Sequence, residues 1–192
     1  MNELQKGGDI YLVGGGKSLR GFNFMRLKNR QVICCNRAFE FIPWAMAVCF
    51  YDPKFYEKYR KQLLAFDGWK ITHKQVTGTD AQGNNKIVEL RSDFAGEAVN
   101  NTGHFALNVA LKFTNPDRIF LLGYDYTDIS PEQAKQMKPG DLNFYTYPEG
   151  MTIAGFGQYV EKFDEFKGME IYNCNPDSNL TQFKYVDIDT II

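Results

Sequence analysis

The sequence lacks three features that would each have placed it in a familiar class of protein. It has no long basic run, and its 22 lysines and arginines face 23 aspartates and glutamates, so the charge pattern of a nucleic-acid-binding protein is absent. No apolar stretch approaches the length of a membrane span, and the first ten residues, MNELQKGGDI, contain no apolar signal segment. We therefore expect a cytoplasmic protein without a membrane span that binds no nucleic acid.

Metal-binding and disulfide patterns are missing as well. The four cysteines, at positions 34, 35, 49 and 174, form no CxxC pair and lie in or beside apolar runs, which favours reduced, buried thiols. Aromatic residues are abundant, with 16 Phe and 11 Tyr, and most of them fit a hydrophobic core. Exposed aromatic segments could also serve contacts in a homo-oligomer. The length of 192 residues suits a single domain, residues 1–192.

Short apolar runs alternate with helical patterns along the chain. Strands are expected at 9–13, 31–35, 45–51, 69–72, 86–90, 118–123 and 169–173. Helices are expected at 18–27, capped by Ser18, at 54–64, at 100–113, capped by Thr102, and at 157–166. Several strands are apolar throughout, as in sheets covered on both faces. This predicts an α/β fold, a Rossmann-like three-layer sandwich with a mainly parallel sheet.

Residues 127–150 are rich in Pro, Gly and Tyr and show no regular pattern. A connection of this length is unusual in a compact α/β domain unless it has a function of its own. We therefore expect a lid loop at about 127–150.

The stretch IYLVGGGKSL runs from a strand into Gly14, Gly15 and Gly16, followed by Lys17 and Ser18. A P-loop would need glycine at position 11, which is tyrosine, and the dinucleotide pattern G-x-G-x-x-G would need it at position 19, which is leucine. Three glycines still allow the backbone to pass close to a ligand, and a helix starting at Ser18 would direct N–H groups at an anion. This favours a phosphate site; the alternative is a tight turn that requires positive φ.

Small or polar residues follow the other predicted strands too. They are Asn36, Asp52, residues 100–103 and residues 123–125. Each asparagine alone is better explained as a turn residue. Because ligands of parallel α/β sheets bind outside the carboxyl ends of the strands, their coincidence at neighbouring strand ends favours a ligand site. Asn36 and Asn101 can donate and accept hydrogen bonds at once, which suits a base edge, a ribose or a phosphate.

Some of these residues could also carry chemistry. His104 follows Gly103 near a predicted helix start, where a neutral imidazole can act as a base; a packing role is the alternative. Asp52, Asp125 and Asp128 could hold Mg²⁺ between nucleotide phosphates. Tyr124, Tyr126, Tyr145 and Tyr147 could stack on a base or supply a hydroxyl.

Three stretches in order along the chain resemble a known superfamily. IYLVGGGKSLRGFNFMRLKNRQVICCNRAFEF resembles the start of the bacterial sialyltransferases that use CMP-sialic acid, with a G-x-G-x-S-L turn after the first strand. NNTGHFALNVALKFTNPDRIFLLGYDYTD and IYNCNPDSNLTQF resemble their second and closing signatures. The same skeleton occurs in 6-hydroxymethylpterin diphosphokinase-like (MptE-like) proteins and in many phage and bacterial proteins.

The resemblance implies that a nucleotide binds across the strand ends, with a CMP-type ligand favoured. By match to the motifs, Gly14, Gly16 and Ser18 would face the phosphate, and Asn36 the phosphate or ribose. Asn101, Thr102 and Gly103 would meet the sugar or base, Asp125 would be an acid near the base and ribose, and Ser178 would lie at the rim.

The chain departs from this superfamily in two places. The lid region has no histidine where the sialyltransferases place their catalytic one, and Lys17 stands where they carry proline. Lys17 would add a positive charge for a phosphate or, alternatively, merely point to solvent. The first hypothesis is a glycosyltransferase-like enzyme that uses a nucleotide-activated donor, with His104 or Asp125 as the catalytic group. The alternatives are a nucleotide-binding protein without catalysis and a Mg-dependent pterin-type diphosphokinase.

Overall fold

The computed structural model describes residues 6–73, 87–89, 101–127, 129, 131–136, 141, 143–144 and 157–192. Asp128 and most of the expected lid, 127–150, lie outside these residues. Of the strand expected at 86–90, residues 87–89 are described.

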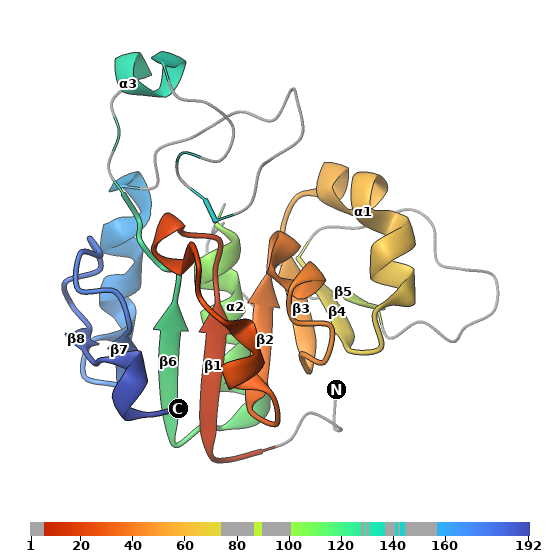
Figure 1. Cartoon of the computed structure of the whole chain (residues 1–192), viewed down its shortest axis with the longest axis horizontal. Coiled ribbons are helices and arrows are strands. Elements are labelled where there is room, and N and C mark those ends of the chain that lie inside the picture. Colours follow the sequence, from red (N-terminus) through yellow and green to blue (C-terminus); the bar gives the residue numbers. More distant parts are fainter. Residues whose placement is uncertain are drawn as a thin grey trace.

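The strands form one sheet in which all pairings between strands are parallel. Its order is β5-β4-β3-β2-β1-β6-β7-β8 (Figure 1). The strands are β1 (Asp9–Val13), β2 (Gln31–Cys35), β3 (Ala47–Phe50), β4 (Trp69–Thr72), β5 (Ile87–Glu89), β6 (Arg118–Leu122), β7 (Ile171–Asn173) and β8 (Lys184–Tyr185). The prediction of a mainly parallel sheet is confirmed, and β8 adds a short strand at the edge.

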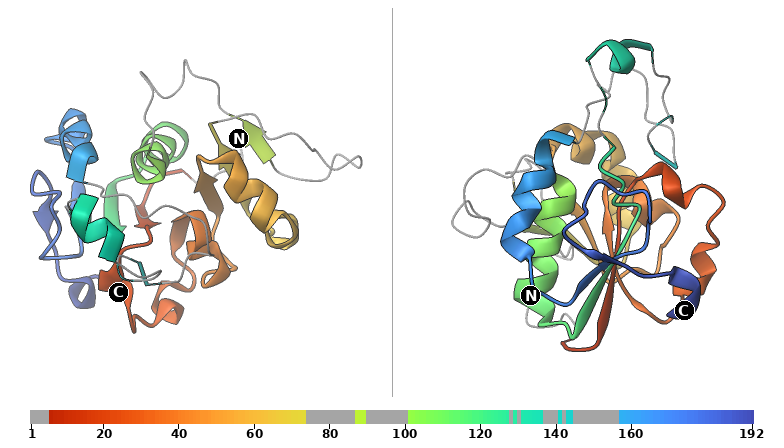
Figure 2. Two further views of the ribbon diagram at one scale, coloured as in Figure 1. Left: turned by 90° about the horizontal axis from the view of Figure 1, so that it is seen from above. Right: turned by 90° about the vertical axis from the view of Figure 1, so that its left-hand side faces the viewer.

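The sheet is covered on both faces, so the predicted three-layer Rossmann-like arrangement is confirmed (Figure 2). On one face, α2 (Thr102–Thr114) and the 3₁₀-helix η5 (Gly157–Phe166) pack against Ile10 and Leu12 of β1. The other face carries α1 (Pro53–Ala65) and the short 3₁₀-helices η1 (Lys17–Leu19), η2 (Phe24–Leu27) and η3 (Asn36–Glu40). η6 (Ile188–Thr190) adds Ile188 to the core of this second face, and α3 (Pro131–Gln136) lies apart from the layers (Figure 1).

Two local predictions are wrong. The helix expected at 18–27, with Ser18 as its cap, is replaced by the separate turns η1 and η2. Gly21 between them has φ +78°, which a right-handed helix cannot contain, and Asn23 starts the second turn by accepting a hydrogen bond from Met25 N. The cap of α2 is Asn101 and not Thr102, because the Asn101 side chain accepts from His104 N at 3.1 Å.

The sheet reverses its order of connection at β1. This strand lies between β2 and β6, and Val13 is in register with Cys34 on one side and Leu122 on the other. The arrowheads of β1, β2 and β6 therefore point to one common edge (Figure 1). Such a reversal is where open α/β sheets bind their ligands. Among the described helices, none combines the length and the apolar character needed to cross a membrane.

Candidate functional site at the carboxyl ends of the strands

The three glycines continue the pairing of β1 with β6. Gly14 N donates to Leu122 O and Gly16 N to Gly123 O, both at 2.8 Å. A Cβ on Gly14 would lie 2.6 Å from the carbonyl oxygen of Gly123, so a side chain is excluded there. Positive φ is not the reason for these glycines, because it occurs instead at Gly123, with φ +67°. The turn requires glycine because two backbone segments approach closely.

Asp125 is the centre of the turn's hydrogen bonding. Its carboxylate accepts from Ser18 N at 2.9 Å, from Ser18 Oγ at 2.5 Å and from Asn175 Nδ2 at 3.0 Å. A Cβ on Gly16 would lie 2.5 Å and 2.6 Å from the two carboxylate oxygens. Asp125 is buried and joins three segments that are far apart in the sequence. The roles of catalytic acid and metal ligand stay predictions for Asp125, and in the structure its carboxylate links the glycine turn to the loop after β7.

The predicted rim residue Ser178 is likewise bound within the chain. Its hydroxyl donates to Tyr124 O at 2.6 Å and accepts from Asn173 Nδ2 at 2.8 Å. Asn179 adds two more links, from its N to Asp125 O at 3.0 Å and from its Nδ2 to Tyr126 O at 2.9 Å. The loop after β7 therefore holds the end of β6 in place. Sequence reasoning missed Asn173, Asn175 and Asn179; the cluster of asparagines in NCNPDSN was the available signal.

Two tyrosines that follow β6 form hydrogen bonds with residues at the start of α2. Tyr126, at φ +50°, donates from its hydroxyl to Asn101 Oδ1 at 2.5 Å, and Tyr124 donates to Gly103 O at 3.2 Å. A Cβ on Gly103 would meet the Tyr126 hydroxyl and lie 3.1 Å from Tyr124 Cε1. Both rings are buried, so Tyr124 packs inside the protein. The prediction that it stacks on a base is not favoured by this position.

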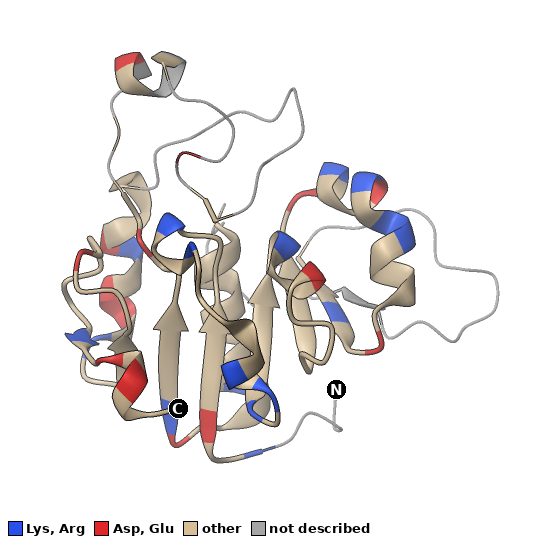
Figure 3. Ribbon diagram, in the orientation of Figure 1, with Lys and Arg blue, Asp and Glu red and all other residues tan. Residues whose placement is uncertain are grey.

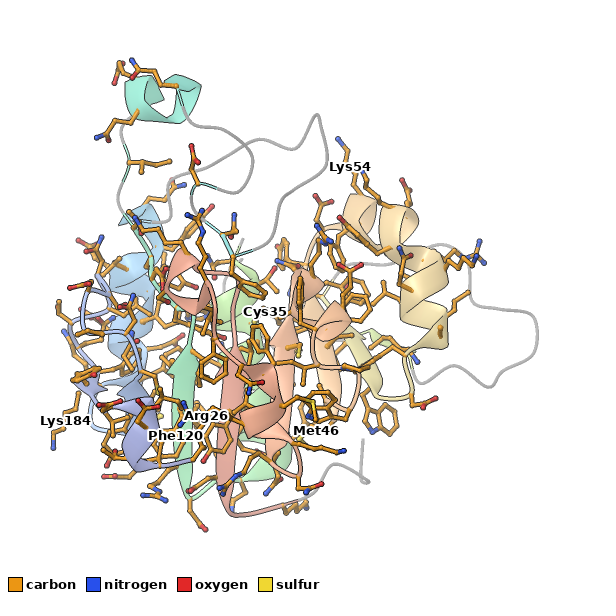
Figure 4. All side chains as sticks on the ribbon, viewed as in Figure 1. Arg26, Cys35, Met46, Lys54, Phe120 and Lys184 are labelled. Atoms are coloured by element: carbon orange, nitrogen blue, oxygen red, sulfur yellow. The ribbon has the colours of Figure 1, made fainter. Side chains whose placement is uncertain are left out.

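Asn36 and Thr102 lie side by side at the same edge. Asn36 follows β2 with φ +49°, and Thr102 Oγ1 donates to Asn36 Oδ1 at 3.4 Å. Just below them, Cys35 lies at the upper end of β2 (Figure 4). Burial raises the pKa of the Cys35 thiol to about 12, which keeps it protonated and makes it a poor nucleophile. All four cysteines are free of disulfide bonds.

His104 lies between α2 and η5. Its Nε2 is 2.6 Å from Glu165 Oε1 and 3.1 Å from Lys162 O, and its Nδ1 is 3.2 Å from Asn108 Nδ2. Its ring is enclosed by the aromatic rings of η5, and burial lowers its pKa. Both ring nitrogens are engaged inside the protein, as in the packing alternative. This surrounding does not favour the predicted role as a base.

The remaining predicted carboxylate, Asp52, caps α1, because its Oδ1 accepts from Lys54 N at 2.9 Å. Among the described residues, no group of three Asp, Glu, His or Cys side chains could hold a metal ion.

Lys17 and Ser18, which directly follow the glycines, are both exposed. Basic residues occur in the segment after β1 and along α1, beside the same edge (Figure 3).

Part of the expected lid lies on the glycine turn. Phe144 N donates to Gly15 O at 3.0 Å, and Asn143 forms an isolated antiparallel bridge with Gly16. The ring of Phe144 packs against Phe24 and Phe41, with centroids 5.2 Å and 5.0 Å apart. The lid was predicted without this contact, because the sequence around residues 143–144 does not indicate that they pair with the glycine turn.

No family model matches the sequence, and no curated protein matches it. Among solved structures, the chain is similar to the sialyltransferase CST-II, in a crystal structure with a trisaccharide acceptor and CMP. The TM-score is 0.49 and the identity 15%, over 93% of this chain and 85% of that one. At these values no residue's role follows from the likeness.

Proposed function

We propose that the protein binds a nucleotide at the carboxyl ends of β1, β2 and β6, and transfers a group from a nucleotide-activated donor. One observation carries the proposal: the glycine turn lies where the sheet reverses its connection, with Lys17 exposed directly beyond it. Parallel α/β sheets bind ligands at this position for a geometric reason. At the reversal, the chain leaves two neighbouring strands toward helices on opposite faces of the sheet.

Each wall of this site suits a different part of a nucleotide. Lys17 supplies a positive charge for a phosphate group, since Ser18 already directs both its N–H and its hydroxyl at Asp125. Asn36 and Thr102 present amide and hydroxyl groups suited to a ribose or base. The 13-residue helix α2 starts at Thr102, so the positive end of its dipole faces the same edge.

Within this proposal, a glycosyltransferase-like reaction with a sugar nucleotide is the specific form, and a CMP-linked donor comes first among those to be tested. The sequence resemblance motivates this choice of donor. The closeness of Gly14 and Gly16 to the end of β6 keeps the turn rigid, so charge that develops on the leaving phosphate would meet a fixed environment.

Nucleotide binding without turnover is the second candidate. It is favoured by one specific observation: both titratable residues predicted to act as catalytic groups, His104 and Asp125, have their polar atoms occupied by partners within the chain. In this case the protein would sense or sequester a nucleotide.

Calorimetric titration with CMP, CTP, UDP, ATP, GTP and their sugar derivatives, with and without Mg²⁺, tests the shared part of both candidates. Lys17→Met should weaken binding about tenfold, because a charge-assisted hydrogen bond to phosphate contributes about 1.5 kcal/mol. Lys28→Met is the matched control, since Lys28 is also exposed but precedes β2 at the opposite edge. Equal affinities of the two variants would contradict the placement of the phosphate.

Release of free nucleotide from sugar nucleotides then separates the two candidates. Turnover that depends on the wild-type protein supports the transferase. Tight binding with no release, across donors and simple sugar acceptors, supports the binding protein.

A further inference from the structure

The two histidines of the sequence have opposite surroundings. His104 has partners at both ring nitrogens, whereas Nδ1 and Nε2 of His73 are buried and have no hydrogen-bond partner in the described part of the chain. Nearly all buried polar atoms in proteins are paired, so an imidazole with two unpaired nitrogens requires an explanation. One physical explanation is that the ring is held for a ligand.

His73 lies at the same edge of the sheet as the glycine turn. It directly follows β4, and because Phe50 and Thr72 are in register, Tyr51 and His73 are the next pair beyond the strand ends. Their rings stack, with centroids 5.3 Å apart and planes 15° apart. Phe105 meets the imidazole edge-on at 5.9 Å and 83°. These contacts fix the plane of the ring, and both buried nitrogens are left without a hydrogen-bond partner in the described part of the chain.

The distance from the glycine turn suits a donor of the proposed kind. β4 is the third strand from β1, and neighbouring strands lie about 4.8 Å apart, so the two positions are separated by about 14 Å. A nucleotide with an attached sugar extends over a comparable distance. Phe105 is also one helical turn beyond Thr102, so the first turn of α2 borders both places.

We propose that His73 accepts the proton of the acceptor hydroxyl in the transfer reaction, a role that rests on the proposed function. In that step the acceptor oxygen forms a bond to the transferred group, and its proton passes to a ring nitrogen of His73. The bond between the transferred group and the nucleotide's phosphate oxygen breaks, and its electron pair stays on the phosphate. Histidine is the residue that most often takes such a proton.

Because the sequence has only two histidines, NMR can follow each imidazole of the full chain separately. A protein labelled at the histidine ring should give two sets of signals, assigned with His104→Gln. Adding the nucleotide or sugar nucleotide that binds in the calorimetric titration should shift the His73 signals more than those of His104. Unchanged His73 signals at saturating ligand would overturn the proposal while leaving nucleotide binding intact.

Rate measurements complete the test, with the sugar nucleotide as donor and a simple sugar or water as acceptor. His73→Asn and His73→Gln should lower kcat at least about 100-fold while the nucleotide affinity stays within about twofold. Asp67→Asn, exposed at the opposite end of β4, should leave both quantities unchanged. A wild-type rate in both His73 variants would overturn the proposal, and so would a loss of nucleotide affinity equal to the loss of rate.

Discussion

Asp125→Asn is expected to loosen the link between the glycine turn, the end of β6 and the loop after β7. The carboxylate accepts hydrogen bonds from three donors, Ser18 N, Ser18 Oγ and Asn175 Nδ2. An amide of the same shape keeps one acceptor oxygen but places two N–H groups where the second oxygen was. At least one donor of Ser18 or Asn175 would then face another donor.

The size of the effect depends on the kind of bond that is lost. A hydrogen bond to a charged acceptor contributes about 1.5–3 kcal/mol, and the exposure of Ser18 places this case at the lower end, so we expect about 2 kcal/mol. Urea unfolding followed by the fluorescence of Trp44 and Trp69 would measure it. With a slope of about 3 kcal/mol per M urea, the midpoint should fall by about 0.7 M.

The control is Asp117→Asn. Asp117 is exposed and accepts one backbone hydrogen bond, from Gly8 N at 3.0 Å, so its replacement should change the free energy of unfolding by less than about 0.5 kcal/mol. The structural role of Asp125 would be refuted if Asp125→Asn unfolded at the wild-type urea concentration but no longer bound nucleotide. In that case its carboxylate would contact the ligand, as the sequence resemblance implied.

Three further predictions concern neighbouring positions. Gly16→Ala should lower the free energy of unfolding by about 2 kcal/mol in urea titrations, because its Cβ would lie 2.5 Å from an oxygen of Asp125; wild-type stability would mean that the turn can widen. Asn101→Ala should cost about 1 kcal/mol by the same assay, since it removes the cap of α2. The pKa of His104 is lowered mainly by burial, against the opposing charge of Glu165, so the folded state resists protonation. Stability should be complete above the ordinary histidine pKa of about 6.5 and fall as the pH drops below it, and the difference in urea midpoint between about pH 7.5 and about pH 5.5 should shrink in His104→Gln.

The sheet could be predicted from the sequence because its strands are buried on both faces. Runs such as IYLV and IFLLG have no polar face, which is typical of central parallel strands, and they correspond to β1 and β6. The failure at 18–27 has a local cause. A helical pattern of apolar residues was present, but Gly21 adopts positive φ and divides the segment into two turns.

The candidate site could be predicted only in part. The position of a residue after a strand indicates the edge of the sheet at which it lies, but not which residues its side chain contacts. The glycine turn and Asn36 were found from their places after β1 and β2, and the structure brings them to one edge. The engagement of Ser18 by Asp125, 107 residues away, depends on how the two strand ends pack. His73 gave no signal, since its unpaired nitrogens are visible only once its neighbours are known.

Whether a residue can act in the proposed reaction depends on which of its polar atoms already have hydrogen-bond partners within the folded chain. Asp125, Ser178 and His104 stood out in the sequence as ionisable or hydroxyl groups near strand ends, yet each has its polar atoms occupied by the chain. Their bonds fix the ends of β6, β7 and α2, and such rigidity is what an electrostatically prepared site needs. For the proposed reaction we therefore assign the phosphate contact to Lys17, which is exposed, and the proton transfer to His73, whose ring nitrogens have no hydrogen-bond partner in the described part of the chain. The division is physically reasonable, because a carboxylate cannot hold three donors and also change its protonation state during a reaction without weakening the turn that it supports.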